Sequence, residues 1–436
     1  MKKLIFLPIF FLVLTLSCKK DNVTPDNTLT PAMARDSLYY IMKEWYYWYN
    51  MPEATSVTTS NKGNYSDPYE LLDAMRYKTI DRWSFVMDYD KFVATMQQGT
   101  FVGHGFRIGL DNTGNARIAM IYSNSPLYAN GVRRGWIVKK INDTDIAPIL
   151  LRGDGAAYTS LIGASTTGVT NKFLFQSPDG GDITITSTKS SFQINSVLLY
   201  DTLNLSTGVT GHLVFESFIE LSENELATAF AYFSSTGVKD LILDLRYNSG
   251  GYLSVAQSLA SYIAGNAMQG SAFVKFLYND KHPTQNSTYP FKTTSYPLGL
   301  TRLVVITSRS TASASEAVMN GLKPYLNVVS IGDTTDGKPT GMNGWDIGKK
   351  YYMWPVTFKV VNAQNQGEYF DGIFPAKALP DDITRDFNDK EEVCLKEAIH
   401  FLEIGSVSTK GGLPFKPAPQ FSEKPKWMNN AFVLEK

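Results

Sequence analysis

Residues 303–340 constrain the fold of this chain more than any other stretch. They read LVVITSRSTASASEAVMNGLKPYLNVVSIGDTTDGKPT. An apolar run beginning at Leu303 stops at a turn of small residues. Apolar residues from Ala314 and Ala317 onward then recur at helical spacing, and a second apolar run follows. This pattern predicts a β-turn-α-β unit with Ser313 at the start of the helix. Backbone N–H groups and the positive end of the helix dipole converge at such a position, where they would stabilise a nucleophile and a developing oxyanion.

A serine nucleophile needs a base, and Lys338 follows the next predicted strand in the turn TDGKP. A lysine acts as a base only when it is neutral. Lowering its pKa from about 10.4 toward ~7 requires roughly 4–5 kcal/mol of destabilisation of the charged form, which burial can supply. A histidine base is the alternative, because His212, Asp244 and Ser313 occur in the chain order of one known triad class. The identity of the nucleophile is open as well, because three other serines lie nearby: Ser308, Ser310 and Ser315.

The composition indicates a folded protein and excludes several classes of function. The 436 residues are 43% hydrophobic and 13% aromatic, which suffices for two or three domains with real cores. Lys+Arg and Asp+Glu both number 41, so the overall charge gives no reason to expect nucleic acid as a partner. Cys18 and Cys394 are the two cysteines, and the four histidines have no ligand spacing. We therefore expect no disulfide framework, no metal site and no cofactor, with Cys394 as an inert core thiol.

The first residues have the pattern of an export signal. Residues 1–18 carry two lysines, an apolar run and then Ser17 and Cys18. A small residue before a cysteine at the end of the apolar run resembles a bacterial lipoprotein cleavage site, which would make Cys18 the lipidated N-terminus. An ordinary signal peptide with an incidental cysteine is the alternative. Residues 19–30 are polar and predict a tether to the membrane surface.

The remaining chain predicts a multidomain protein of the α/β and β classes. We expect a helical N-terminal region at 31–98, a β module at 99–190, a mostly parallel α/β sheet at 191–405 and a tail at 406–436 that is extended or disordered. Within the α/β region, residues 266–300 show no clear period and predict a long loop over the working end of the sheet. Asp244 ends a predicted strand, where we expect it to orient a neighbouring group.

The β module resembles a PDZ domain. The resemblance rests on Gly103, His104, Gly105 and Phe106 in the position of the carboxylate-binding loop, followed by SPLYANGVRRGW. Such a loop offers backbone N–H groups to the C-terminal carboxylate of a peptide, which adds as a strand beside it. The alternative is that Gly-His-Gly is only a turn at a strand edge.

Three further motifs occur in the order found in one protease family: LILDLRYNSGG at 241–251, TASASEAVMNGL around Ser313, and GKP at 337–339. With them, nearly all of residues 31–405 resembles a C-terminal processing peptidase, also called a tail-specific protease. The resemblance implies a serine endopeptidase with Ser313 as nucleophile and Lys338 as general base. It also implies an oxyanion hole formed by the N–H of Ala314 and one N–H from Gly250 and Gly251.

The sequence departs from this family at Met342, where members often carry a glutamine that helps to orient the lysine. Another group must then hold Lys338. The resemblance implies protein or peptide substrates with free C-termini, and the lipoprotein-like signal implies a lipid-anchored location in the bacterial cell envelope. The alternative function is a catalytically silent scaffold that binds peptides through its PDZ-like module without cutting them.

Overall fold

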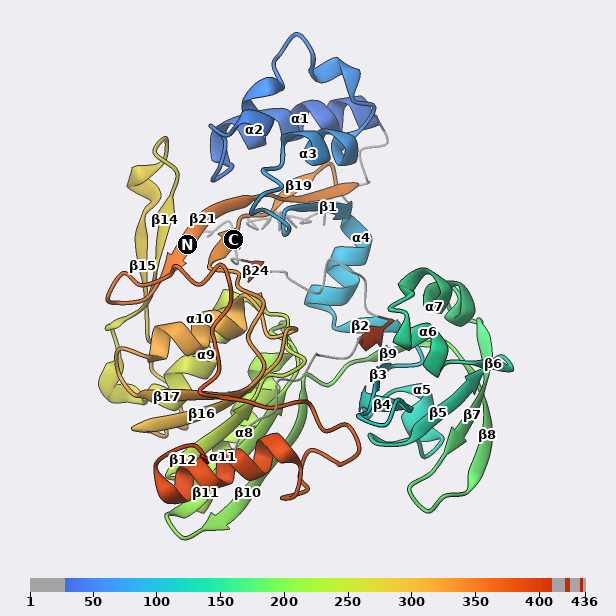
Figure 1. Ribbon diagram of the computed structural model, residues 1–436. Helices are drawn as coiled ribbons and strands as arrows, with labels where there is room; N and C mark the ends of the chain where they lie inside the picture. The colour runs from blue at the N-terminus through green and yellow to red at the C-terminus, as the bar shows by residue number, and fades with distance from the viewer. Residues whose placement is uncertain (1–27, 410–419, 424–431, 434–436) are drawn as a thin grey trace, which may run out of the picture.

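The computed structural model describes residues 28–409, 420–423 and 432–433. The predicted signal peptide, Cys18 and nearly all of the tether lie outside these residues. No helix within the described ranges is long and apolar enough to cross a membrane. Figure 1 shows the N-terminal helices at the top, the α/β core below them, and the β module at the side of the core.

The N-terminal region is helical, as predicted, but its last part joins the core. Its helices are α1 (Pro31–Trp45), α2 (Pro52–Ser56), α3 (Pro68–Met75), α4 (Tyr89–Phe92), a 3-10 turn (Lys62–Asn64) and a π-helical turn (Val93–Gln97). The Thr30 hydroxyl caps α1, and proline opens the first turn. The strand β1 (Phe85–Asp88) pairs with β20 (Tyr351–Trp354), which pairs in turn with β19 (Trp345–Ile347). This sheet binds the N-terminal region to a late part of the chain.

The β module contains two strand pairings that are far apart in sequence. Its elements are β2 (Thr100–Gly103), β3 (Phe106–Leu110), β4 (Ala116–Ile121), α5 (Pro126–Ala129), β5 (Ile137–Ile141), β6 (Thr144–Asp145), α6 (Ala147–Leu151), α7 (Gly155–Ile162), β7 (Thr170–Gln176), β8 (Asp182–Thr188) and β9 (Ser190–Gln193). β2 pairs with β9, and the main sheet has the order β3-β4-β5-β7-β8. A strand from the C-terminal tail, β23 (Gln420–Ser422), adds to the β3 edge.

The α/β core is a mostly parallel sheet, as predicted. Its strands lie in the order β10 (Val197–Leu205), β11 (Gly208–Phe215), β12 (Asp240–Asp244), β16 (Arg302–Thr307), β17 (Asn327–Gly332) and β22 (Lys377–Ala378). The pairings are parallel except for the hairpin of β10 with β11. The connecting helices are α8 (Ser222–Thr236), α9 (Leu253–Ala264) and α10 (Ala314–Leu322), and the last helix is α11 (Val393–Ile404).

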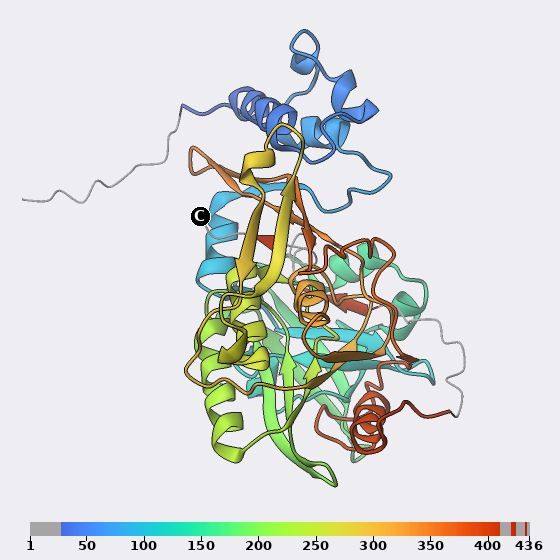
Figure 2. The same ribbon diagram turned by 90° about the vertical axis from the view of Figure 1, so that its left-hand side faces the viewer.

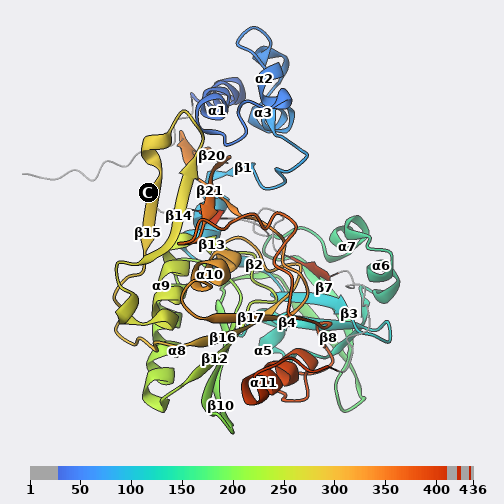
Figure 3. The same cartoon turned by 60° about the vertical axis from the view of Figure 1, so that its left-hand side comes forward.

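Alternating residues of the central strands build two separate cores. Leu303 and Val305 of β16 pack with α8, α9 and α10, whereas Val304 and Ile306 pack against α11. Figure 3 shows α10 and α11 on opposite sides of β16 and β17. Both faces of the sheet are therefore covered, which explains why its strands are apolar throughout.

A second sheet corrects the prediction of a long loop at 266–300. It runs β13 (Gly251–Tyr252), β24 (Phe432–Val433), β18 (Thr340–Met342), β21 (Val356–Val361), β14 (Ala272–Tyr278) and β15 (Ser287–Pro290). β14 and β15 form a hairpin within residues predicted to be loop. A 3-10 turn (Asn266–Met268) precedes the hairpin, and another (Pro283–Gln285) lies between its two strands. Figure 2 shows this hairpin rising beside the N-terminal helices. The ring of His282, at its tip, stacks on Trp45 with the centroids 3.7 Å apart.

Candidate active site

Ser313 lies at the N-terminus of α10, where the sequence predicted a nucleophile. It has φ 60° and ψ −111°, a backbone conformation that a residue with a side chain rarely adopts. Its hydroxyl is buried and makes no hydrogen bond to any described residue. Strained, buried and unpartnered side chains of this kind cluster at functional sites, where the surrounding structure holds them in place.

The hydroxyls of the three other candidate serines all make hydrogen bonds. Ser308 Oγ donates to the backbone carbonyl of Arg246, and Ser315 Oγ donates to that of Asn248 at 3.0 Å. Ser310 Oγ accepts from Arg107 at 3.1 Å. The structure therefore assigns structural contacts to these three and leaves the hydroxyl of Ser313 available.

Lys338 is buried, with 1% of its surface exposed. Burial lowers its pKa to about 7, although the nearby carboxylates of Asp336, Asp81 and Glu316 favour the charged form. Its Nζ lies 4.0 Å from Met342 Sδ. Ser313 Oγ and Lys338 Nζ make no hydrogen bond to each other in this structure, because the serine hydroxyl has no partner.

The Glu316 carboxylate joins the two turns that carry Ser313 and Lys338. Its Oε2 accepts both the N–H of Ser313 and the N–H of Lys338, each at 2.8 Å, so these backbone nitrogens lie within about 6 Å of each other. Its Oε1 accepts the N–H of Gly337 at 2.7 Å and the Thr335 hydroxyl. Burial raises the pKa of Glu316 to about 7, and the four donors oppose that rise. No spacing in the sequence indicated this role of Glu316.

The predicted oxyanion-hole glycines lie against the nucleophile. Gly250 has φ 103°, and a Cβ added there would lie 2.9 Å from the Cβ of Ser313 and 3.1 Å from the nitrogen of Ala314. The N–H of Gly250 already donates to Asn248 Oδ1 at 2.9 Å. Gly251 in turn belongs to β13, which pairs with β24. The carbonyl of Asn248 also accepts the N–H of Ala312 at 3.1 Å and thereby ties this turn to the nucleophile turn.

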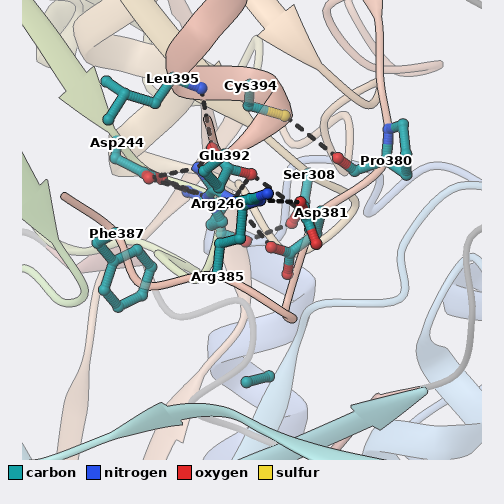
Figure 4. Close-up of polar contacts among 12 residues, drawn as sticks. Asp244, Arg246, Ser308, Pro380, Asp381, Arg385, Phe387, Glu392, Cys394 and Leu395 are labelled. Carbon is teal, nitrogen blue, oxygen red and sulfur yellow. Dashed lines mark hydrogen bonds and ion pairs between the residues drawn. The ribbon is translucent and has the colours of Figure 1, made fainter. Parts of the chain in front are cut away.

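Asp244 orients a neighbour, as predicted. It accepts from the Nε of Arg246 at 2.9 and 3.0 Å, and the guanidinium also contacts Glu392 at 2.9 Å and Asp381 at 2.8 Å. Figure 4 shows Arg246 surrounded by these three carboxylates. Burial by itself would raise the pKa of Asp381, but Arg134 and Arg246 hold it well below its usual range. This network fixes the chain just before the Gly250 turn.

The histidine alternative has no support in the geometry. Both ring nitrogens of His212 are buried without a partner among the described residues, and burial lowers its pKa to about 4. The Asp244 carboxylate is committed to Arg246. Cys394 is likewise a core residue, since it is buried, its Sγ contacts the Pro380 carbonyl at 3.3 Å, and burial raises the pKa of its thiol.

The N-terminal region also contributes residues near Lys338. Lys338 Nζ lies 5.9 Å from the ring centroid of Trp83, whose Nε1 donates to Asp336 Oδ2 at 3.1 Å. Asp81 accepts the N–H groups of Trp83 and Ser84, both at 2.9 Å. No spacing in the sequence links these residues to Lys338, because the contact forms only in the folded chain.

The loop at Gly103, His104, Gly105 and Phe106 contacts a carboxylate. The N–H groups of His104 and Gly105 donate to Glu423 Oε2 at 2.7 and 3.0 Å. The His104 ring is buried, with Nδ1 2.9 Å from Ser187 Oγ and Nε2 2.7 Å from Asn171 Oδ1, and burial lowers its pKa. Gly103 ends β2 and Phe106 begins β3, so the loop connects these two strands. Within the described ranges, no cluster of three or more His, Cys, Asp or Glu residues could hold a metal ion.

Comparison with known proteins identifies the family of these domains. Residues 209–375 match the model of peptidase family S41, and residues 34–85 match the peptidase S41 N-terminal domain. The segment at 209–375 contains Ser313, Glu316 and Lys338. The residues between the two segments include the module predicted to resemble a PDZ domain.

Similar proteins include processing proteases. The carboxy-terminal processing protease CtpB of Bacillus subtilis is 23% identical over 323 residues, which cover 72% of this chain and 60% of that protein. CtpA of the same organism is 29% identical over 130 residues, 30% of this chain and 26% of that protein. The chain thus aligns with about 60% of the length of the first relative and about a quarter of the second.

Solved structures share the fold. A Bacteroides fragilis protein assigned to the S41 proteases has a TM-score of 0.68 at 22% identity, covering 84% of this chain and 96% of that one. The photosystem II D1 C-terminal processing protease has a TM-score of 0.52 at 18% identity, covering 84% of this chain and 97% of that one. The chain therefore carries the domains of peptidase family S41 and is homologous to the carboxy-terminal processing proteases.

Proposed function

We propose that this chain is a serine endopeptidase in which Ser313 is the nucleophile and Lys338 the general base. One observation carries the proposal: a single buried carboxylate, Glu316, accepts the backbone N–H groups of both residues. Two further observations support it: the serine hydroxyl has no partner among the described residues, and burial brings the lysine pKa to about 7. The family relationship supports a peptidase role.

In the proposed reaction, the neutral Lys338 amine takes the proton of Ser313 Oγ as the oxygen attacks the scissile carbonyl carbon. The resulting oxyanion accepts hydrogen bonds from the N–H of Ala314 and from one N–H of the turn at Gly250 and Gly251. The Lys338 ammonium then protonates the leaving amine, and water hydrolyses the acyl-serine ester. Contacts between nucleophile and base are often long in a site without substrate and tighten when the substrate binds. Each oxyanion donor typically contributes about 3–4 kcal/mol to catalysis.

The test is hydrolysis of an unfolded protein by the wild type, Ser313→Ala, Lys338→Ala and Lys338→Arg. We expect all three variants to be inactive and folded, because nucleophile and base act as one unit and arginine cannot be neutral near pH 7. Ser310→Ala is the matched serine control and should keep its activity. Substantial activity in Lys338→Arg would exclude a lysine base. An inactive wild type that still binds peptides would favour the scaffold alternative.

The module at 99–190 is proposed to bind a free, mostly apolar C-terminus through Gly103, His104, Gly105 and Phe106. The N–H groups of this loop suit a carboxylate, and the edge of β3 can pair with an added strand. Peptides that differ only in C-terminal amidation provide the test. Equal binding of the amidated and free-acid forms would show that the loop is not a C-terminal carboxylate site.

The proposed location is the bacterial cell envelope, with Cys18 lipidated. Acyl chains contribute roughly 0.8 kcal/mol per buried CH₂, so the wild type should stay in the membrane fraction through a high-salt wash. Cys18→Ser should abolish the modification and release an active body. Recovery of the wild type as a soluble species that starts at another residue would instead indicate an ordinary signal peptide.

A further inference from the structure

The C-terminal segment at 420–423 lies on the module as a peptide ligand would. β23 pairs antiparallel with β3, with Gln420 opposite Gly109, Phe421 opposite Ile108 and Ser422 opposite Arg107. β3 begins directly after the loop predicted to bind carboxylates. An added strand at this edge is the arrangement by which modules of this kind recognise extended peptides.

The side chain of Phe421 fills an apolar position between β3 and α7. Its ring stacks on that of Tyr158 in α7, with the centroids 5.1 Å apart and the planes 21° from parallel, and it packs against the apolar core of the module. Gly155, the first residue of α7, has no side chain, and a Cβ added there would lie 3.5 Å from this ring. The segment therefore has an apolar anchor in addition to its backbone hydrogen bonds.

Glu423 supplies a carboxylate at the position of a peptide terminus. Besides accepting the N–H groups of His104 and Gly105, it lies with Oε1 3.2 Å from the Nζ of Lys189. The side chains of Glu423 and Lys189 are 1% and 0% exposed. Lys189 Nζ also donates to the carbonyls of Gly163 and Ala164 at 3.0 and 3.1 Å, which fixes the ammonium in place. A buried cation and two converging N–H groups form a built anion site.

The same tail also contacts the α/β core. The side chain of Gln420 donates to Asp381 Oδ2 at 3.2 Å and lines a cavity of about 670 Å³ between module and core. Farther on, β24 pairs with Gly251 and Tyr252 of β13 and with Met342 of β18. These strands follow the proposed oxyanion turn and the proposed base. β23 and β24 thus contact the module and the strands that follow the proposed oxyanion turn and the proposed base.

We propose that residues 420–423 are an intramolecular ligand that occupies the peptide groove of the module, so that a substrate C-terminus must displace them. The proposal rests on the proposed function only in taking this groove as the substrate site. The side-chain carboxylate of Glu423 stands in for a terminal carboxylate, and Lys189 is the cation that both would use.

The test measures binding without hydrolysis. Full-length Ser313→Ala protein is titrated into a fluorescein-labelled peptide that ends in Val-Val-Ala with a free carboxylate, and Kd is read from fluorescence anisotropy. Adding Glu423→Gln should lower Kd roughly tenfold or more, because the tail loses its charge-assisted hydrogen bonds. Phe421→Ala should also lower Kd, and this substitution leaves the charge of the anion site unchanged. Glu391→Gln, at an exposed carboxylate that pairs with Lys396, is the matched control and should leave Kd unchanged.

A competition experiment tests the same contact in trans. A synthetic peptide of residues 416–426, amidated at its C-terminus, should displace the labelled peptide from the Ser313→Ala/Glu423→Gln protein. Its counterpart with glutamine at position 423 should be at least roughly tenfold weaker.

Kd values within twofold of each other for Ser313→Ala and both tail variants would overturn the proposal, as would the absence of peptide binding in every variant. The outcome is independent of catalysis. Tail variants that bind the peptide more tightly, together with a wild type that cleaves nothing, would refute the proposed function and support the intramolecular ligand.

Discussion

At the scale of single residues, burial sets the chemistry of Lys338. The side chain is 1% exposed, and its pKa of about 7 gives a substantial neutral fraction near neutral pH. Met342 provides a thioether at 4.0 Å, a weak acceptor, so this neighbour does little to favour the ammonium form. The departure at Met342 is therefore compatible with a neutral lysine, and the ring centroid of Trp83 lies 5.9 Å from the amine.

This burial predicts the pH dependence of activity. Only neutral Lys338 can act as a base, so kcat/KM should rise roughly tenfold between pH 6 and 8 and level off above the pKa of about 7. The unfolded chain binds more protons at this lysine between pH 7 and its ordinary value, so the free energy of unfolding should also rise across that window. A pH–rate profile measured alongside thermal unfolding checks both trends. An activity midpoint near pH 10 would show that the amine has an ordinary environment.

Glu316→Gln should cost both stability and activity. Each carboxylate oxygen accepts two donors, and an amide nitrogen accepts none, so one pair of buried donors loses its acceptor. We expect a loss of roughly 2–5 kcal/mol in the free energy of unfolding and a fall of kcat by about 10² or more. Chemical denaturation and hydrolysis assays measure the two effects.

Glu225→Gln is the matched control for Glu316. Glu225 accepts from Ser196 Oγ and the N–H of Val197, and it lies in α8, away from the turns of Ser313 and Lys338. The Glu225→Gln variant should have a lower free energy of unfolding than the wild type and an unchanged kcat. Full activity in Glu316→Gln would mean that the two turns hold their positions without the carboxylate.

At the scale of elements, the site depends on three short turns that follow β12, β16 and β17. The carboxyl ends of neighbouring parallel strands lie at the same edge of a sheet, so the turns meet although they are far apart in sequence. Helix α10 begins in one turn, and its Glu316 holds the next. In the turn that follows β12, the Asn248 carbonyl accepts hydrogen bonds from the Ser315 hydroxyl and the N–H of Ala312.

Gly250→Ala tests how closely these turns approach one another. The added Cβ would lie 2.9 Å from the Cβ of Ser313 and would force a side chain into φ 103°. We expect kcat to fall by about 10² or more, because a displacement of about 1 Å at a nucleophile is enough for such a loss. Gly237→Ala is the control, since Gly237 also has a positive φ but has nothing within 4 Å. It should lower stability by roughly 1 kcal/mol and leave kcat unchanged.

At the scale of the whole molecule, Arg134 fastens the module to the core. It donates to Tyr247 Oη at 2.6 Å, Asp381 Oδ1 at 2.9 Å and the Arg385 carbonyl at 2.8 Å. Tyr247 lies between Arg246 and the Gly250 turn. The position of the module is thus coupled by direct contacts to the chain that leads into the proposed oxyanion hole.

Arg134→Gln should loosen this interface. Removing one partner of a buried ion pair costs roughly 3–5 kcal/mol, and hydrogen exchange at 381–385 should become faster. Arg133→Gln is the control, because Arg133 is exposed and donates only to carbonyls within the module, those of Tyr128 and Val132. Equal exchange rates in both variants would contradict the assigned role of Arg134.

The sequence by itself determined the local features. Apolar periodicity predicted the parallel strands and the helix after Ser313, because a strand buried on both faces must be apolar throughout. Spacing and motif order pointed to Ser313, Lys338 and the glycine turn, which all lie within a region that matches peptidase family S41. The assignment of Ser313 and Lys338 as nucleophile and base is still a prediction, as are the lipid anchor and C-terminal recognition.

Only the tertiary structure decided the long-range contacts. It turned part of residues 266–300 into a hairpin, since β14 gains hydrogen bonds from β21, which lies far along the chain. It brought Trp83 to Lys338 and Glu423 to the loop at His104. Such contacts leave no period or spacing in a single sequence, because their stability comes from burial and pairing that exist only once distant segments have packed together.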